Sequence, residues 1–172
     1  MRAFVAVALP EAVVDLLRAL DRPALPEVRW TTPEQWHVTL RFLGDVPDLA
    51  AVAGALTTVP ERLRAHHGGL VRAELGPAAA WFPGRQVLQV PVAGLDVLAA
   101  VVAEALEPWC GPPDRPFVGH LTLARTRGRA RGPLALAGGA VAATWEVAEV
   151  ALLSSHLAAE GARYRVESAV AL

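Results

Sequence analysis

The sequence contains no lysine, a single cysteine and no long hydrophobic run, although apolar residues are abundant. All 16 basic residues are arginines, which we attribute mainly to genome composition. Against 17 acidic residues they give a net charge of −1, and this balance argues against a protein that coats nucleic acid duplexes nonspecifically. Cys110 alone cannot form an internal disulfide framework or a cysteine-rich zinc site. We therefore expect an inert thiol in an intracellular, cytoplasmic protein.

The apolar stretches are too short to cross a membrane or to serve as a signal peptide. The N-terminal run ends after about seven residues at Pro10, and the stretches at 49–56 and 97–106 are closed by Pro60 and Pro108. A length of 172 residues with 53% hydrophobic content suits one compact unit. We expect one domain spanning 1–172, with no membrane association and a monomer as the default state.

Hydrophobic periodicity predicts short strands interleaved with helices. The expected strands are Arg2–Leu9, Val28–Trp30, His37–Phe42, Leu70–Leu75, Val87–Val92, His120–Arg125, Val147–Leu153 and Arg163–Val170. The expected helices are Glu11–Leu20, Asp48 to about His66 with a break near Pro60, Leu95–Glu107 halted by Pro108, and a short one from Pro133. The second half repeats the order of the first, which predicts an internally duplicated α+β chain with two lobes meeting face to face.

Two similar tetrapeptides stand at equivalent points of these halves: His37-Val38-Thr39-Leu40 and His120-Leu121-Thr122-Leu123. Side chains alternate between the two faces of a strand, so each motif presents an imidazole and a hydroxyl to one face and two apolar residues to the other. We therefore expect two histidines and two threonines around one cleft.

This set of side chains suits displacement at phosphorus. One imidazole can remove a proton from the attacking oxygen while the other protonates the leaving oxygen. Hydroxyls of Thr39 and Thr122 can donate hydrogen bonds to the phosphate oxygens. The nearby carboxylates Glu34, Asp45 and Asp114 do not form a cation cage, so neither a metal nor another cofactor is expected.

With these motifs the sequence resembles the 2H phosphoesterases, and within them the bacterial and archaeal RNA 2′,3′-cyclic phosphodiesterases first named 2′-5′ RNA ligases. The resemblance covers nearly the whole chain, including the segments 2–6, 36–46, 117–125, 153–157 and 161–164. Gly119 departs from the family pattern, which commonly has proline before the second motif, and this puts the local rigidity there in doubt.

The resemblance implies a bilobal fold with two antiparallel sheets lining a central cleft and helices outside. It also implies hydrolysis of RNA or nucleotide 2′,3′-cyclic phosphates to 2′-phosphomonoesters, with 2′-5′ ligation as a weak secondary activity. We assign His120 as base and His37 as acid, although the near-symmetry of the cleft leaves the reverse open. Two alternatives remain: a ligase acting on tRNA halves, and an RNA-end binding module without turnover.

Several residues around the two motifs have candidate roles. Arg125 matches a family position at the cleft end of its strand, where its guanidinium can bind phosphate, and Arg41 is its candidate partner in the first motif. The aromatic residues Trp30, Trp36, Trp81, Phe82 and Phe117 are either core residues or a stacking platform for a terminal base. Tyr164 is expected to be structural or to line the cleft, and His156 to be structural.

Overall fold

The computed structural model describes residues 2–158 and 161–172. Its strands are β1 (Arg2–Val7), β2 (Val28–Trp30), β3 (Val38–Asp45), β4 (Arg72–Leu75), β5 (Ala80–Trp81), β6 (Val87–Ala93), β7 (His120–Thr126), β8 (Ala143–Glu146), β9 (Glu149–Ala158) and β10 (Gly161–Ala171). Its helices are α1 (Glu11–Arg18), α2 (Leu49–Leu56), α3 (Val59–His67) and α4 (Asp96–Cys110), with short 3-10 turns η1 (Pro33–Gln35) and η2 (Leu134–Leu136). The expected mixture of helices and strands is confirmed.

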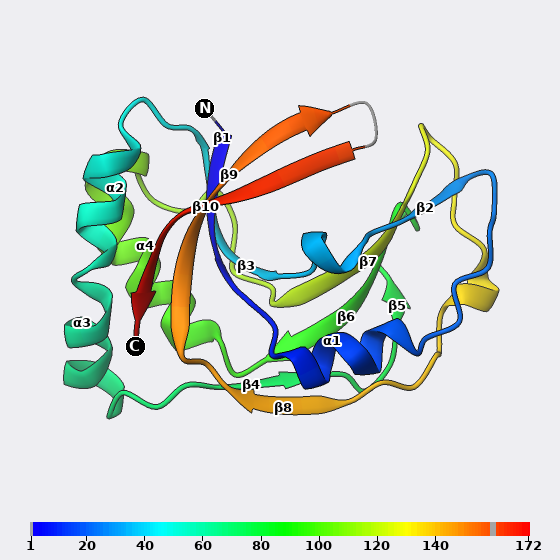
Figure 1. The fold of residues 1–172 in the computed structure, drawn as a ribbon, viewed down its shortest axis with the longest axis horizontal. Helices are drawn as coiled ribbons and strands as arrows, with labels where there is room; N and C mark the ends of the chain where they lie inside the picture. Colours follow the sequence, from blue (N-terminus) through cyan, green and yellow to red (C-terminus); the bar gives the residue numbers. More distant parts are fainter. Residues whose placement is uncertain (1, 159–160) are drawn as a thin grey trace.

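The ten strands form one curled antiparallel sheet (Figure 1). Its path runs β10-β9-β1-β3-β7-β6-β4-β8, with β2 paired to β7 and β5 to β6. Strands β3 and β7 meet at one register pair, Val38 with Leu121. The two sheets expected from the sequence are the two halves of this sheet, on either side of that pair.

The halves of the sheet do not coincide with the halves of the chain. After β4, β6, β7 and β8 have built one half, the C-terminal hairpin of β9 and β10 returns to the other and pairs with β1. Strand β1 therefore lies between β3 and β9, and every one of its residues from Ala3 to Val7 is buried. The first strand of the chain becomes an interior strand only because the last strands cover its free edge.

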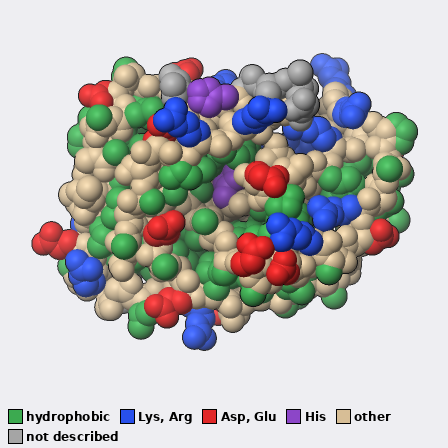
Figure 2. All heavy atoms as spheres, in the orientation of Figure 1, with side chains coloured by type: hydrophobic (Ala, Val, Ile, Leu, Met, Phe, Trp, Pro, Cys, Tyr) green, Lys and Arg blue, Asp and Glu red, His purple; other side chains and the backbone are tan. Residues whose placement is uncertain are grey.

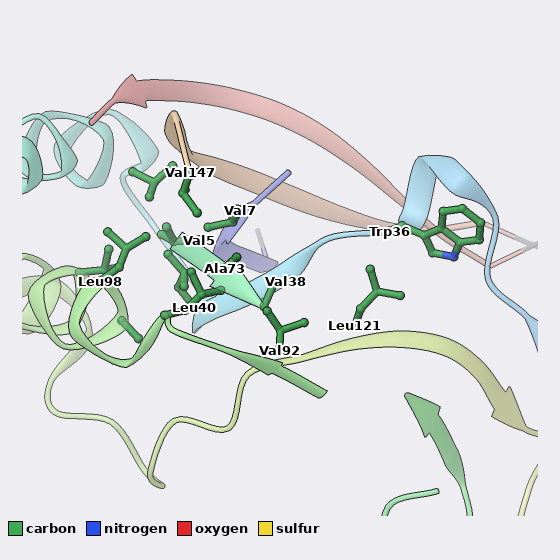
Figure 3. Packing of buried hydrophobic residues seen from close by; sticks show 14 of the residues in the cluster. Val5, Val7, Trp36, Val38, Leu40, Ala73, Val92, Leu98, Leu121 and Val147 are labelled. Atoms are coloured by element: carbon green, nitrogen blue, oxygen red, sulfur yellow. The ribbon is translucent and has the colours of Figure 1, made fainter. Parts of the chain in front are cut away.

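Much of the hydrophobic core lies between the sheet and helices α2, α3 and α4, and the core extends to Val13 and Leu17 of α1. Helix α4 packs on β3, while α2 packs on α4 and reaches β10 (Figure 1). Figure 3 shows Val5, Leu40 and Leu98 converging there from β1, β3 and α4. The motif residues expected to face inward, Val38, Leu40, Leu121 and Leu123, are all buried. The predicted alternation along both motifs is thus confirmed.

Element boundaries differ from the sequence predictions at two prolines. Helix α4 continues through Pro108 to Cys110, because a proline in the last turn removes one hydrogen bond and the Gly111 amide still closes on the Glu107 carbonyl at 2.8 Å. The break in the 48–66 segment falls between Leu56 and Val59, ahead of Pro60, which occupies the first turn of α3. Strands β5 and β8 are not predicted from the sequence, because they are too short to show a clear alternation of apolar and polar residues.

Candidate active site

A cleft of about 330 Å³ opens on the sheet where its two halves meet. Figure 2 shows a hollow near the middle of one face, with histidine atoms inside it and both basic and acidic side chains around it. The residues that line the cleft come from both halves of the sheet: Arg2, Ala3, Phe4, Thr31, Gln35, His37, Thr39, Phe42, Gly44, His120, Thr122, Arg125, Ser155 and Tyr164. Five of the six residues singled out from the sequence are among them, and Arg41 is not.

Each histidine is oriented by a backbone carbonyl two residues before it. Nδ1 of His120 lies 2.8 Å from the carbonyl oxygen of Val118, and the His37 ring is hydrogen-bonded to the Gln35 backbone. A carbonyl oxygen can only accept, so the ring nitrogen in each bond carries the proton and the other nitrogen is left with its lone pair in the neutral form. The two motifs thus repeat the same local arrangement as well as the same residues.

Thr31, in the segment that leads to the first motif, is hydrogen-bonded to the backbone of the second motif. Its amide donates to the Leu123 carbonyl at 2.9 Å, and its hydroxyl lies 2.8 Å from the carbonyl oxygens of both Thr122 and Leu123. The Thr31 hydroxyl also accepts a hydrogen bond from the Trp36 indole at 2.9 Å. These bonds use the backbone of Thr122 and leave its hydroxyl available to the cleft.

His37 sits against a wall of aromatic rings. Its ring lies 4.8 Å from that of Phe4 and 5.1 Å from that of Tyr164, which it meets edge to face at 89°. Burial in this wall lowers the pKa of His37 to about 4, with the hydrogen bond to Gln35 opposing the shift and the nearby charge of His120 adding to it. At neutral pH the His37 imidazole therefore carries no charge.

The two predicted arginines have different surroundings. Arg125 is exposed at the end of the cleft, as its place in β7 suggested. Arg41 is buried on the other face of β3, where its Nη2 donates to the Gly111 carbonyl. A bulge explains the difference: Val5 pairs with Arg41 and Ala6 with Thr39, so one extra residue turns Arg41 away from the cleft. Simple alternation from His37 failed at this point, and the geometry gives no support for contact between Arg41 and substrate.

The aromatic residues of the cleft are not those expected from the sequence. Among the five candidates, Phe82 packs edge-on against His120 at 4.9 Å, while the indoles of Trp30 and Trp81 are tied to backbone carbonyls. Phe4, Phe42 and Tyr164 line the cleft instead. The cleft position of Tyr164 is one of the two that the sequence allows, whereas the sequence gives no cleft role to Phe4 or Phe42. Phe42 could not have been found by alternation, because the same bulge brings it to the cleft face.

Two further sequence features have structural explanations. Gly119, where the family pattern has proline, lies where an added Cβ would be 2.1 Å from the Val92 carbonyl oxygen, so the close approach of β6 favours glycine in this chain. His156 has its Nε2 3.2 Å from the Ser154 hydroxyl, which donates to Glu167 at 2.6 Å. This network does not line the cleft, in agreement with the structural role expected for His156.

In the described ranges, no three His, Cys, Asp or Glu side chains are grouped so that they could hold a metal ion. Over the same residues, no helix is long and apolar enough to span a membrane.

Comparison with known proteins places the chain in a family. Residues 5–81 match the model of the LigT-like phosphoesterases. An RNA 2′,3′-cyclic phosphodiesterase of Thermus thermophilus is 32% identical over 96% of this chain and 87% of its own length. The fold also matches the crystal structure of TT0787 of Thermus thermophilus, with a TM-score of 0.80, 29% identity and coverage of 100% of this chain and 98% of that one.

Escherichia coli LigT complexed with 3′-AMP matches with a TM-score of 0.72 and 28% identity, over 99% of this chain and 97% of LigT. A curled antiparallel sheet of this kind is thus shared with LigT-like 2H phosphoesterases. The chain belongs to the LigT-like phosphoesterase family.

Proposed function

We propose that this protein hydrolyses RNA 2′,3′-cyclic phosphate ends to 2′-phosphomonoesters without a metal ion. The observation that carries the proposal is the paired arrangement of His37 and His120 in one cleft, each with one ring nitrogen held by a carbonyl two residues upstream. A relative that is 32% identical is named for this reaction. The nucleotide 3′-AMP is bound in a crystal structure of Escherichia coli LigT, which is consistent with a nucleotide ligand here.

The reaction would proceed by in-line attack at phosphorus. Water loses a proton to one imidazole as its oxygen bonds to phosphorus, and the bond from phosphorus to O3′ breaks as the other imidazole protonates O3′. The hydroxyls of Thr39 and Thr122 donate to the non-bridging oxygens, where negative charge builds in the transition state. Arg125, at the end of the cleft, adds a positive charge to the phosphate site.

Burial favours His37 as the base. Because its pKa is lowered to about 4, the His37 imidazole is neutral at neutral pH, with a lone pair on one ring nitrogen. It can therefore accept the proton of water, and it has no imidazolium proton to donate. His120 is then the acid that protonates O3′. This reverses the assignment made from the sequence, because sequence spacing contains no information on how deeply each ring is buried.

The test is incubation of the protein in excess EDTA with a short RNA ending in a 2′,3′-cyclic phosphate. We expect opening to the 2′-phosphate, and a loss of about 10²-fold or more in kcat in both His37→Ala and His120→Ala. Thr144→Val, an exposed change on β8, is a control that should retain full activity.

Other outcomes would overturn specific parts of the proposal. A requirement for added metal would exclude the metal-free mechanism, and a 3′-phosphate product would reverse the leaving group. Tight binding of the RNA end without turnover would indicate a binding module instead. Activity that survives both histidine substitutions would place the active site elsewhere.

A further inference from the structure

The cleft has an arginine at each end. Strands β3 and β7 are antiparallel and pair at Val38 and Leu121, so they lead away from the histidines in opposite directions. Arg125 lies toward the end of β7, whereas Arg2 lies at the start of β1, opposite Asp45 at the far end of β3. Both arginines line the cleft, on either side of the reacting centre.

The backbone of Arg2 lies well along the sheet from the motif threonines. Thr39 is opposite Ala6 on β1, and the four residues from there to Arg2 span about 13 Å of strand. Arg2 is exposed, and within 2–158 and 161–172 its guanidinium makes no hydrogen bond or ion pair. A free cation that borders a phosphate cleft at this separation suits a second phosphate group.

The wall between Arg2 and the histidines is suited to a nucleoside. Phe42 is 60% exposed and borders the cleft together with Tyr164 and Ser155, which offers a ring face and hydroxyl groups. Terminal bases of single-stranded RNA are commonly held by stacking on exposed aromatic rings. A nucleoside placed on this wall would direct the RNA backbone toward Arg2.

We propose that Arg2 binds a backbone phosphate upstream of the cyclic end and so makes the protein selective for oligonucleotide ends over cyclic mononucleotides. This inference rests on the proposed function. Its chemistry is ordinary ion pairing between a guanidinium and a phosphodiester, and it adds no step to the reaction. A cyclic mononucleotide has no upstream phosphodiester and cannot make this contact.

The experiment compares two substrates: a 2′,3′-cyclic mononucleotide and a trinucleotide that ends in the same cyclic nucleotide. We expect Arg2→Gln to lower kcat/KM for the trinucleotide by about 5- to 10-fold, as for loss of one exposed charged hydrogen bond, and to leave the mononucleotide unchanged. The slope of log KM against log salt for the trinucleotide should fall by about 0.7, the value for one phosphate contact on a single strand. Arg72→Gln, an equal change of charge at an exposed position of β4 outside the cleft, should resemble the unmodified protein on both substrates.

The inference would be overturned if Arg2→Gln affected both substrates equally or affected neither. A purely structural role of Arg2, such as pairing with Asp45 across the sheet, would not distinguish the trinucleotide from the mononucleotide. Failure of the proposed function would look different, because the unmodified protein would then open neither substrate. In that case, the affinities of the unmodified protein and of Arg2→Gln are measured for a trinucleotide ending in a 2′-phosphate and for the 2′-mononucleotide. This binding experiment tests the role of Arg2 without turnover. Equal loss of affinity for the two ligands in Arg2→Gln, or none, would again overturn it.

Discussion

At the scale of single residues, the partly buried imidazole of His37 sets the expected pH dependence. A base must be unprotonated, and the pKa of His37 is lowered to about 4, so kcat/KM should show no loss from protonation of the base above about pH 5 and should fall below it as His37 gains a proton. The profile should be measured with and without His120→Ala. If His37 is the base, the acid limb persists in that variant at reduced activity. An acid limb near pH 6.5, the ordinary value for imidazole, would contradict the assignment.

Arg41 provides a second prediction at this scale, because its buried guanidinium has a stabilising role away from the cleft. In the described structure its Nε and Nη1 have no hydrogen-bond partner, whereas Nη2 binds Gly111. Arg41→Ala should lower the free energy of unfolding by about 2–3 kcal/mol through lost packing and an unpaired carbonyl. Arg41→Met also leaves this carbonyl unpaired, but it keeps the apolar stem and removes the two buried nitrogens that have no partner, so it should cost less than about 1 kcal/mol.

Urea unfolding measures both effects, and steady-state kinetics at a temperature where the variants are folded gives the matching control. KM should stay within about 2-fold of the unmodified value in Arg41→Met, because the side chain does not reach the cleft. A much larger increase in KM would restore the substrate role that strand alternation had suggested for Arg41.

At the scale of elements, the β9–β10 hairpin forms one wall of the cleft and shields one side of His37 from solvent. Tyr164 on β10 meets the His37 ring at 5.1 Å and the Phe4 ring at 5.1 Å. Tyr164→Ala should expose His37 and raise its pKa toward the ordinary value of about 6.5, because burial is the main cause of the shift. NMR titration of the His37 imidazole measures this directly.

Tyr164→Phe distinguishes the contribution of the Tyr164 ring from that of its hydroxyl, because it removes only the hydroxyl. It retains the ring contact and should leave the pKa of His37 close to 4. An unchanged titration in Tyr164→Ala would show that the hairpin does not control the environment of His37. The acid limb of kcat/KM should move with the NMR pKa if both report the same group.

At the scale of the whole molecule, the path of the chain joins the two halves of the sheet into one folding unit. The chain begins in one half, builds the other, and returns through β9 to cover β1. We expect a single cooperative transition in urea, with far-UV circular dichroism and tryptophan fluorescence coinciding.

Trp36→Phe and Trp145→Phe each remove one of the five tryptophans, so the fluorescence lost in the two variants comes from different halves of the sheet: Trp36 precedes β3 and Trp145 lies in β8. Both variants should give the same midpoint by fluorescence as by circular dichroism. Separate midpoints would show that the halves unfold independently, contrary to the single domain expected from the sequence.

The sequence by itself determined the local features of this protein. Strand alternation placed Val38 and Leu121 in the core and His37, Thr39, His120 and Thr122 on the opposite face, because the direction of a side chain in a regular strand depends only on its parity. The repetition of the motif identified the cleft before its geometry was known.

Only the tertiary structure decided what depends on contacts between distant segments. The bulge in β3 is defined by pairing with β1, and it sends Arg41 inward and Phe42 to the cleft. The burial that lowers the pKa of His37 comes from Phe4 and Tyr164, which enter from opposite ends of the chain. The arginines at the two ends of the cleft come from β1 and β7, which are not neighbours in the sheet. Burial and register are properties of the assembled sheet, and no short window of sequence contains them.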